Sequence, residues 1–187
     1  MSEELKQLIE SNGLTYHIET FGCQMNVHES EKIAGVLENL GYKPSESKAA
    51  ADLLLFNTCC VREHAEARLS GHIGALKDHK TGKAYGVLAV CGCMMQQKGA
   101  AHKLMRRFPF VDMVFGTNSI HKLESLLEDV LLRGQRAYCV EEDISIVEDL
   151  PVRRNGGPCA FVNIIYGCNN FCTYCIVPYV HGRERSR

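Results

Sequence analysis

A chain of 187 residues is long enough for one sizeable domain, or for one domain with part of another. Its hydrophobic fraction of 45% and charged fraction of 23% are those of an ordinary globular protein. The formal net charge of -1 shows no overall excess of basic residues, which is mild evidence against an independent RNA-binding module. It does not exclude RNA held by another part of a longer protein.

The amino-terminal segment MSEELKQLIESNG predicts a short, acidic, amphipathic helix. It lacks the basic start and apolar centre of a signal peptide. No apolar run in the sequence approaches membrane-spanning length. We therefore expect a cytoplasmic protein with no membrane partner.

Five short runs farther along the chain have the composition of strands. They are Thr15–Phe21, Leu53–Phe56, Tyr85–Val90, Val111–Phe115 and Arg136–Val140. The second run is continuously apolar, as expected of a strand covered on both faces. The first alternates apolar and polar residues, which fits a central position poorly.

Segments with helical periodicity separate these runs. One carries its apolar stripe from Ile33 to Leu40, with Asn26 and Glu29 as a plausible cap. The others are a segment over 63–76, a segment that follows Tyr85–Val90 and ends at Phe108, and a segment over 120–130. Alternating strands and helices predict parallel strands joined by right-handed crossovers. We therefore expect residues 1–141 to form an α/β domain with a flavodoxin-like, doubly wound parallel sheet of unspecified strand order.

The composition changes after this domain. Residues 142–158 are acidic, then basic, then rich in Gly and Pro, which predicts a linker. A strand over Ala160–Tyr166 opens a second domain, residues 159–187, and leads into a cysteine loop. Only 12 residues follow Cys175, so we expect this domain to be started but not finished.

Ten cysteines in a protein expected in a reducing compartment indicate metal or redox chemistry and not disulfides. Cys168, Cys172 and Cys175 have the spacing C-x3-C-x2-C directly after a predicted strand. Thiolates at this spacing suit an iron–sulfur cluster or zinc, and three ligands leave one metal position open. A zinc loop or three buried thiols is the alternative.

Three further cysteines, Cys23, Cys59 and Cys93, each follow a predicted strand. The carboxyl ends of parallel strands share one edge of a sheet, so these thiols should converge there. Neighbouring Gly22 and Gly92 allow the backbone to approach an inorganic core. Two alternatives stay open: the thiols are simply buried apolar groups, or Cys60 and Cys91 replace their neighbours as ligands.

Four segments resemble the radical SAM methylthiotransferase family, most closely its MiaB-type tRNA-modifying branch. They are GCQMN around Cys23, NTCCVRE around Cys59, GCMMQ around Cys93, and YGCNNFCTYCIVPY. The resemblance extends from about Tyr16 to Arg187, and it selects Cys59 over Cys60 and Cys93 over Cys91. The order C-x3-C-x-aromatic-C also resembles the radical SAM superfamily, in which the residue at the position of Tyr174 lies beside the adenine of S-adenosylmethionine.

The resemblance implies two 4Fe-4S clusters and S-adenosylmethionine as cofactors. Cys168, Cys172 and Cys175 would hold the radical SAM cluster, in the first strand and cluster loop of a radical SAM (β/α) barrel. Cys23, Cys59 and Cys93 would hold an auxiliary cluster. The implied reaction is methylthiolation of carbon 2 of N6-isopentenyladenosine at position 37 of tRNA.

Members of this family continue through the rest of the barrel and an RNA-binding domain. We therefore do not expect these 187 residues alone to turn over tRNA, which the longer protein would bind. The sequence does not indicate an oligomeric state. Two alternative functions stay open, namely methylthiolation of a ribosomal-protein aspartate and a non-catalytic iron–sulfur binding module.

Overall fold

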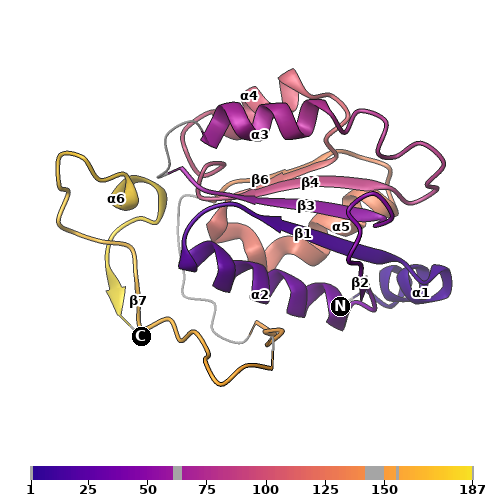
Figure 1. The fold of residues 1–187 in the computed structure, drawn as a ribbon, viewed down its shortest axis with the longest axis horizontal. Coiled ribbons are helices and arrows are strands. Elements are labelled where there is room, and N and C mark those ends of the chain that lie inside the picture. The colour runs from indigo at the N-terminus through magenta and orange to yellow at the C-terminus, as the bar shows by residue number, and fades with distance from the viewer. Residues whose placement is uncertain (1, 61–64, 142–149, 155, 187) are drawn as a thin grey trace.

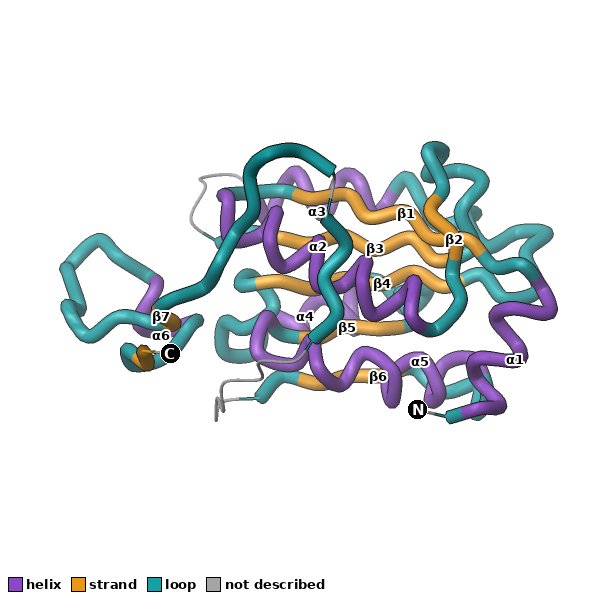
Figure 2. The backbone as a smooth tube through the Cα atoms, turned by 90° about the horizontal axis from the view of Figure 1, so that it is seen from below, coloured by secondary structure: helices purple, strands orange, loops and turns teal. Residues whose placement is uncertain are grey.

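The computed structural model describes residues 2–60, 65–141, 150–154 and 156–186. Of residues 65–68 it describes the backbone but not the side chains. Its main feature is a six-stranded, all-parallel sheet with the order β2-β1-β3-β4-β5-β6. Figure 2 shows the longer strands lying side by side. The strands are β1 Thr15–Thr20, β2 Lys43–Pro44, β3 Leu53–Thr58, β4 Val87–Gly92, β5 Met113–Phe115 and β6 Ala137–Cys139.

Helices cover both faces of this sheet (Figure 1). One buried cluster packs β1, β3 and β4 against α1, α2 and α5, and a second packs β3, β4 and β5 against α3 and α4. The predicted parallel α/β domain is therefore confirmed, and the arrangement is consistent with a flavodoxin-like fold. The helices are α1 Glu3–Asn12, α2 Gln24–Asn39, α3 Ala65–Gly74, α4 Ala100–Arg107, the 3-10 helix η1 Thr117–Lys122, and α5 Leu123–Leu131.

The alternating pattern of β1 follows from its place near the edge of the sheet. Tyr16 and Ile18 belong to the cluster with α1 and α2. His17 and Glu19, on the opposite face, are only partly buried. Among the described residues, the cluster under α3 and α4 contains no residue of β1, so the polar side chains on this face of β1 stay partly exposed to solvent.

The short edge strand β2 was not predicted from the sequence, because proline is disfavoured within a sheet. The backbone N–H groups of Lys43 and Ser45 donate to the carbonyl oxygens of Leu14 and Tyr16, at 3.0 and 2.8 Å. Pro44 lies between these two donors, so its missing N–H removes no hydrogen bond from the sheet.

The predicted limits of β3 and β4 were wrong by two residues. β4 runs over Val87–Gly92 where Tyr85–Val90 was expected, and β3 continues through Asn57 and Thr58. Asn57 pairs with Cys91 and Thr58 with Gly92. The strands thus extend beyond their apolar runs, since backbone pairing continues where the side chains become polar or small.

The described part of the predicted linker packs against α2. The backbone N–H of Arg153 donates to the carbonyl oxygen of Glu31 at 3.0 Å. A Cβ atom on Gly35 would lie 2.3 Å from the carbonyl oxygen of Pro151, so only glycine admits this approach. Residues 142–149 of the predicted linker lie outside the described residues.

The predicted strand Ala160–Tyr166 is a strand only at β7, Ile165–Tyr166. It pairs antiparallel with β8, Arg185–Ser186, after the short helix α6, Val177–Val180. Val162 and Ile164 are 64% and 68% exposed, so the apolar character that predicted a longer strand is not buried within the described residues. A radical SAM barrel is not shown by this segment, which lies beyond one end of the sheet (Figure 1).

Candidate metal centre at the carboxyl edge of the sheet

Cys59 and Cys93 meet at the carboxyl edge of the sheet. Thr58 of β3 pairs with Gly92 of β4, so the two cysteines follow directly after paired residues. Both are buried, at 2% and 4% exposure, and they form one cluster with Val180. The register of two parallel strands therefore brings together thiols that are distant in the sequence.

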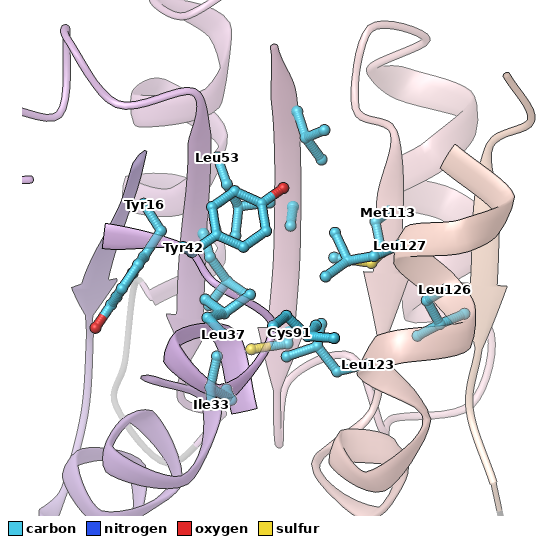
Figure 3. Packing of buried hydrophobic residues seen from close by; sticks show 14 of the residues in the cluster. Tyr16, Ile33, Leu37, Tyr42, Leu53, Cys91, Met113, Leu123, Leu126 and Leu127 are labelled. Atoms are coloured by element: carbon cyan, nitrogen blue, oxygen red, sulfur yellow. The ribbon is translucent and has the colours of Figure 1, made fainter. Parts of the chain in front are cut away.

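Cys60 is a further thiol at this edge. Its backbone N–H donates to Cys93 Sγ at 3.2 Å, and its own Sγ lies 3.4 Å from Cys93 Sγ. Cys91 lies elsewhere, because β4 directs it into the core with Leu37 and Leu123 (Figure 3). The structure thus leaves Cys93 at the edge and Cys91 in the core, while both Cys59 and Cys60 remain beside Cys93.

Cys23 reaches the same edge from β1. It is the N-cap residue of α2, is exposed, and its Sγ lies 3.3 Å from Asn26 Oδ1. Gly22, with a φ of +135°, passes so close to Cys59 that an added Cβ would lie 2.5 Å from Cys59 Cβ. Glycine is required here both by this contact and by the positive φ. The loop that carries Cys23 therefore passes against the residue that carries the second thiol.

A layer of buried polar side chains lies beneath the three cysteine loops. Asn26 and Asn57 hydrogen bond to each other's segments, and Thr58 Oγ1 donates to the carbonyl oxygen of Cys91 at 2.5 Å. The Thr117 hydroxyl donates to the Glu29 carboxyl group. Burial raises the pKa of Glu29 to about 7, against the lowering effects of Thr117, Lys32 and Asn57. The carboxyl group is thus balanced between two protonation states near neutral pH.

The two adjacent thiols differ in acidity. The hydrogen bond with Cys60 and burial raise the pKa of Cys93, against a lowering effect of His181. The hydrogen bond with Cys93 lowers the pKa of Cys60. One proton shared between two neighbouring sulfurs accounts for these opposite directions. Metal binding would require deprotonated sulfur at each ligand.

The second cysteine group lies on one loop between β7 and α6. The Cys168 N–H donates to the carbonyl oxygen of Gly182 at 3.1 Å, and the Cys175 N–H donates to that of Cys172 at 2.9 Å. Phe171 has a φ of +46°, which gives the loop a sharp turn between its first two cysteines. Cys172 is exposed, and Cys168 and Cys175 are partly buried.

Tyr174, on the same loop, is 91% exposed. The structure therefore leaves its ring accessible to a ligand. Its contact with the adenine of S-adenosylmethionine stays a prediction.

The cysteine loop and the sheet edge are in contact. Ile176 and Val180 pack against Cys59 and Cys93, and the side chain of His181 hydrogen bonds with Cys93. These contacts were not predicted from the sequence. They bring the helix that follows Cys175 against the thiols of the first domain, and Figure 1 shows this helix, α6, beyond the corresponding end of the sheet.

Neither group of cysteines is preassembled as a metal site. Within the described residues, no three or more His, Cys, Asp and Glu side chains are arranged to hold a metal ion. The cysteines nevertheless fit an iron–sulfur cluster, because they are soft thiols on loops that also carry glycines.

Part of this site was missed by the sequence analysis. The Asn57–Thr58 pair carried a usable signal, because two polar residues end a fully buried strand. The contacts of Cys60, Ile176 and Val180 carried none, since they depend on how distant segments pack.

No helix within the described residues is both long and apolar enough to span a bilayer.

Comparison with known proteins identifies the family. The model of the uncharacterized protein family UPF0004 matches residues 15–116, which include Cys23, Cys59 and Cys93. The chain belongs to this family.

Several relatives match most of the chain. They include proteins of Caldicellulosiruptor saccharolyticus, at 56% identity over 92% of this chain, and Clostridium tetani, at 52% over 92%. A protein of Thermoanaerobacter sp. (strain X514) is 50% identical over 98% of this chain. Each of the three is named tRNA-2-methylthio-N(6)-dimethylallyladenosine synthase. The expected relationship to the methylthiotransferases is thereby confirmed.

The chain spans only 37%, 38% and 40% of the length of these three relatives. The similarity therefore covers well under half of each relative.

Proposed function

We propose that these 187 residues serve a radical SAM tRNA methylthiotransferase, which modifies carbon 2 of N6-isopentenyladenosine at position 37 of tRNA. The names of the similar proteins support tRNA as the substrate and methylthiolation at carbon 2 of the modified adenosine. In this proposal tRNA is bound by a longer protein, and the reaction takes place in the cytoplasm. These residues alone would not complete it.

The convergence of Cys59 and Cys93 beside the Cys23 loop carries the proposal. Three parallel strands end at one edge, and each is followed by a cysteine. Gly22 and Gly92 keep this edge free of two side chains, since a Cβ on Gly92 would lie 2.3 Å from the carbonyl oxygen of Thr58. An edge built from thiols and glycines suits a bulky inorganic core.

We assign Cys23, Cys59 and Cys93 to an auxiliary 4Fe-4S cluster and Cys168, Cys172 and Cys175 to a radical SAM 4Fe-4S cluster. When bound, these groups with S-adenosylmethionine supply the radical and the sulfur for the reaction. Tyr174, which is accessible, would stack on the adenine of S-adenosylmethionine. Ile176 and Val180 would exclude water between the two groups, because they cover Cys59 and Cys93.

Metal content tests the two-cluster assignment. After anaerobic reconstitution with iron and sulfide, we expect about eight irons per chain, since each cluster contains four. About four irons would contradict one of the two assignments. A chain that takes up neither iron nor sulfide would contradict the proposal as a whole.

Two further measurements separate the alternatives. Reductive cleavage of S-adenosylmethionine to deoxyadenosine by the reconstituted protein would support radical chemistry, and a loaded but inactive protein would support a non-catalytic module. A full-length protein containing these residues, incubated with tRNA and with a ribosomal protein side by side, would decide the substrate. Modification of the ribosomal protein alone would contradict the proposed function.

A further inference from the structure

We propose that Asn26 is a positioning residue of the auxiliary site, whose carboxamide sets the loop of Cys23 against the strand end that carries Cys59. This inference rests on the proposed function, because it assigns Cys23 and Cys59 to one cluster. Asn26 lies in the first turn of α2, three residues after Cys23, and is 2% exposed.

The two ends of the Asn26 carboxamide face different segments. Its Oδ1 accepts from Cys23 at both the sulfur and the backbone N–H, at 3.3 and 3.5 Å. Its Nδ2 donates to the carbonyl oxygen of Thr58 at 3.1 Å. A carbonyl oxygen only accepts hydrogen bonds, so this contact fixes which end of the amide faces Cys23. One planar group thus links Cys23 with the residue directly before Cys59.

Asn57 closes the link from the other side. Asn26 Nδ2 donates to Asn57 Oδ1 at 3.1 Å, while Asn57 Nδ2 donates to the Asn26 carbonyl oxygen at 2.8 Å and to Ser30 Oγ at 3.0 Å. Asn57 is fully buried, at 0% exposure. The two carboxamides therefore connect the start of α2 to the end of β3 through reciprocal hydrogen bonds. Because both side chains are buried, water does not compete readily for these bonds.

The link holds two prospective ligand loops at a set separation. Three thiolates on one four-iron core must occupy defined positions, and groups behind the ligands commonly change metal affinity about 10–100-fold when they are removed. Gly22 already brings the Cys23 loop into contact with Cys59. Asn26 adds direction to this contact, because it accepts a hydrogen bond from the backbone N–H of Cys23, and this bond remains when the thiol loses its proton to bind metal.

A second role for Asn26 makes a different prediction. Its Oδ1 also completes a capping box with the Cys23 backbone, which stabilises the start of α2. Loss of capping alone would lower the stability of the helix but not the iron content of the folded protein. Loss of positioning would lower the iron content of the auxiliary site even in folded protein.

The test uses the full chain in a Cys168→Ala, Cys172→Ala, Cys175→Ala background, so that only the auxiliary site can load. Asn26→Ala and Asn26→Asp are compared with Asn39→Ala, an exposed position at the other end of the same helix. Each variant is reconstituted with ferrous iron and sulfide. The iron content of its folded fraction, defined by circular dichroism and gel filtration, and the electron paramagnetic resonance spectrum of the reduced cluster are then measured.

We expect about four irons per chain for the parent and for Asn39→Ala, and a loss of most of this iron in Asn26→Ala. Asn26→Asp has the same size, but it presents an acceptor to the Thr58 carbonyl oxygen and a negative charge to the thiolates, so it should load less than the parent as well. Equal iron and an unchanged spectrum in both Asn26 variants would overturn the inference while leaving the proposed function intact. A parent that loads no iron would overturn the auxiliary cluster itself.

Discussion

The Sγ atom of Cys60 lies 3.4 Å from the Sγ atom of Cys93, although 33 positions separate these residues in the sequence. The backbone N–H of Cys60 also donates to the same sulfur at 3.2 Å. Cys60 is therefore held beside a proposed cluster ligand without being one of the assigned ligands. Two predictions concern this pair.

The first prediction concerns the choice between Cys59 and Cys60 as ligand. Cys59→Ala should remove the auxiliary cluster and lower the iron content from about eight to about four per chain. Cys60→Ala should leave both clusters in place. Iron analysis after identical reconstitution checks both variants. The assignment is wrong if Cys60→Ala loses four irons and Cys59→Ala does not.

The second prediction concerns the metal-free protein in an oxidant. Oxidised glutathione should couple Cys60 to Cys93, because their sulfurs are already in contact. One sulfur–sulfur bond forms, and the two electrons and two protons reduce the oxidant to two thiols. Mass spectrometry of non-reduced peptides detects the link. Iron uptake after this treatment should then fall to about four irons per chain, because Cys93 is no longer available.

A matched pair of variants tests the specificity of this link. Cys139→Ser should still form the Cys60–Cys93 disulfide, since Cys139 lies in β6 at the far edge of the sheet. Cys60→Ser should not form it and should keep its capacity for both clusters after the same treatment. Disulfides distributed evenly over many cysteines would contradict this prediction.

The third prediction concerns the pH dependence of stability. Burial raises the pKa of Glu29 from 4.5 to about 7 in the folded protein. Between these values the folded state keeps a proton that the unfolded chain has released, so the free energy of unfolding falls as the pH rises through this range. The full effect is about 3 kcal/mol, because one pKa unit corresponds to about 1.4 kcal/mol.

Glu29→Gln should remove this contribution, because the amide does not titrate. Urea unfolding at pH 5 and pH 8 measures the difference in both proteins. Glu10→Gln, on the exposed part of α1, is the control and should retain the dependence of the parent. The same loss of stability between the two pH values in Glu29→Gln and the parent would show that another group is responsible.

The fourth prediction concerns Tyr174. Its exposed ring makes the fold insensitive to truncation, so Tyr174→Ala should change the free energy of unfolding by no more than about 0.5 kcal/mol. The affinity of the Tyr174→Ala variant for S-adenosylmethionine should fall roughly tenfold, as expected for a lost aromatic stacking contact. Equilibrium binding to the reconstituted protein measures this. Tyr179→Ala, at another exposed tyrosine, should bind like the parent; equal affinity in both variants would remove Tyr174 from the cofactor site.

Much of the first domain could be predicted because its signals are local. The apolar run Leu53–Phe56 indicated a fully covered strand, and β3 is buried along its whole length. The alternation in β1 correctly indicated a strand with one covered face. It did not indicate where in the sheet this strand lies, which the strand order supplies. The second domain was predicted less well, because an apolar run such as 160–166 becomes a strand only where a neighbour accepts its hydrogen bonds.

Local residue patterns were enough to predict the alternation of strands and helices and to place Cys23, Cys59 and Cys93 after three strand ends. Parallel connections then require these residues to share one edge, which is a rule of topology and needs no coordinates. Three other features became visible only in the folded chain, namely the separation of Cys91 from Cys93, the contact of Cys60 with Cys93, and the link from Asn26 to Thr58. These features depend on the register of β3 against β4 and on the packing of segments far apart in the chain. The continuously apolar run Leu53–Phe56 has the same pattern on both faces of the sheet, so its residues alone do not specify the register.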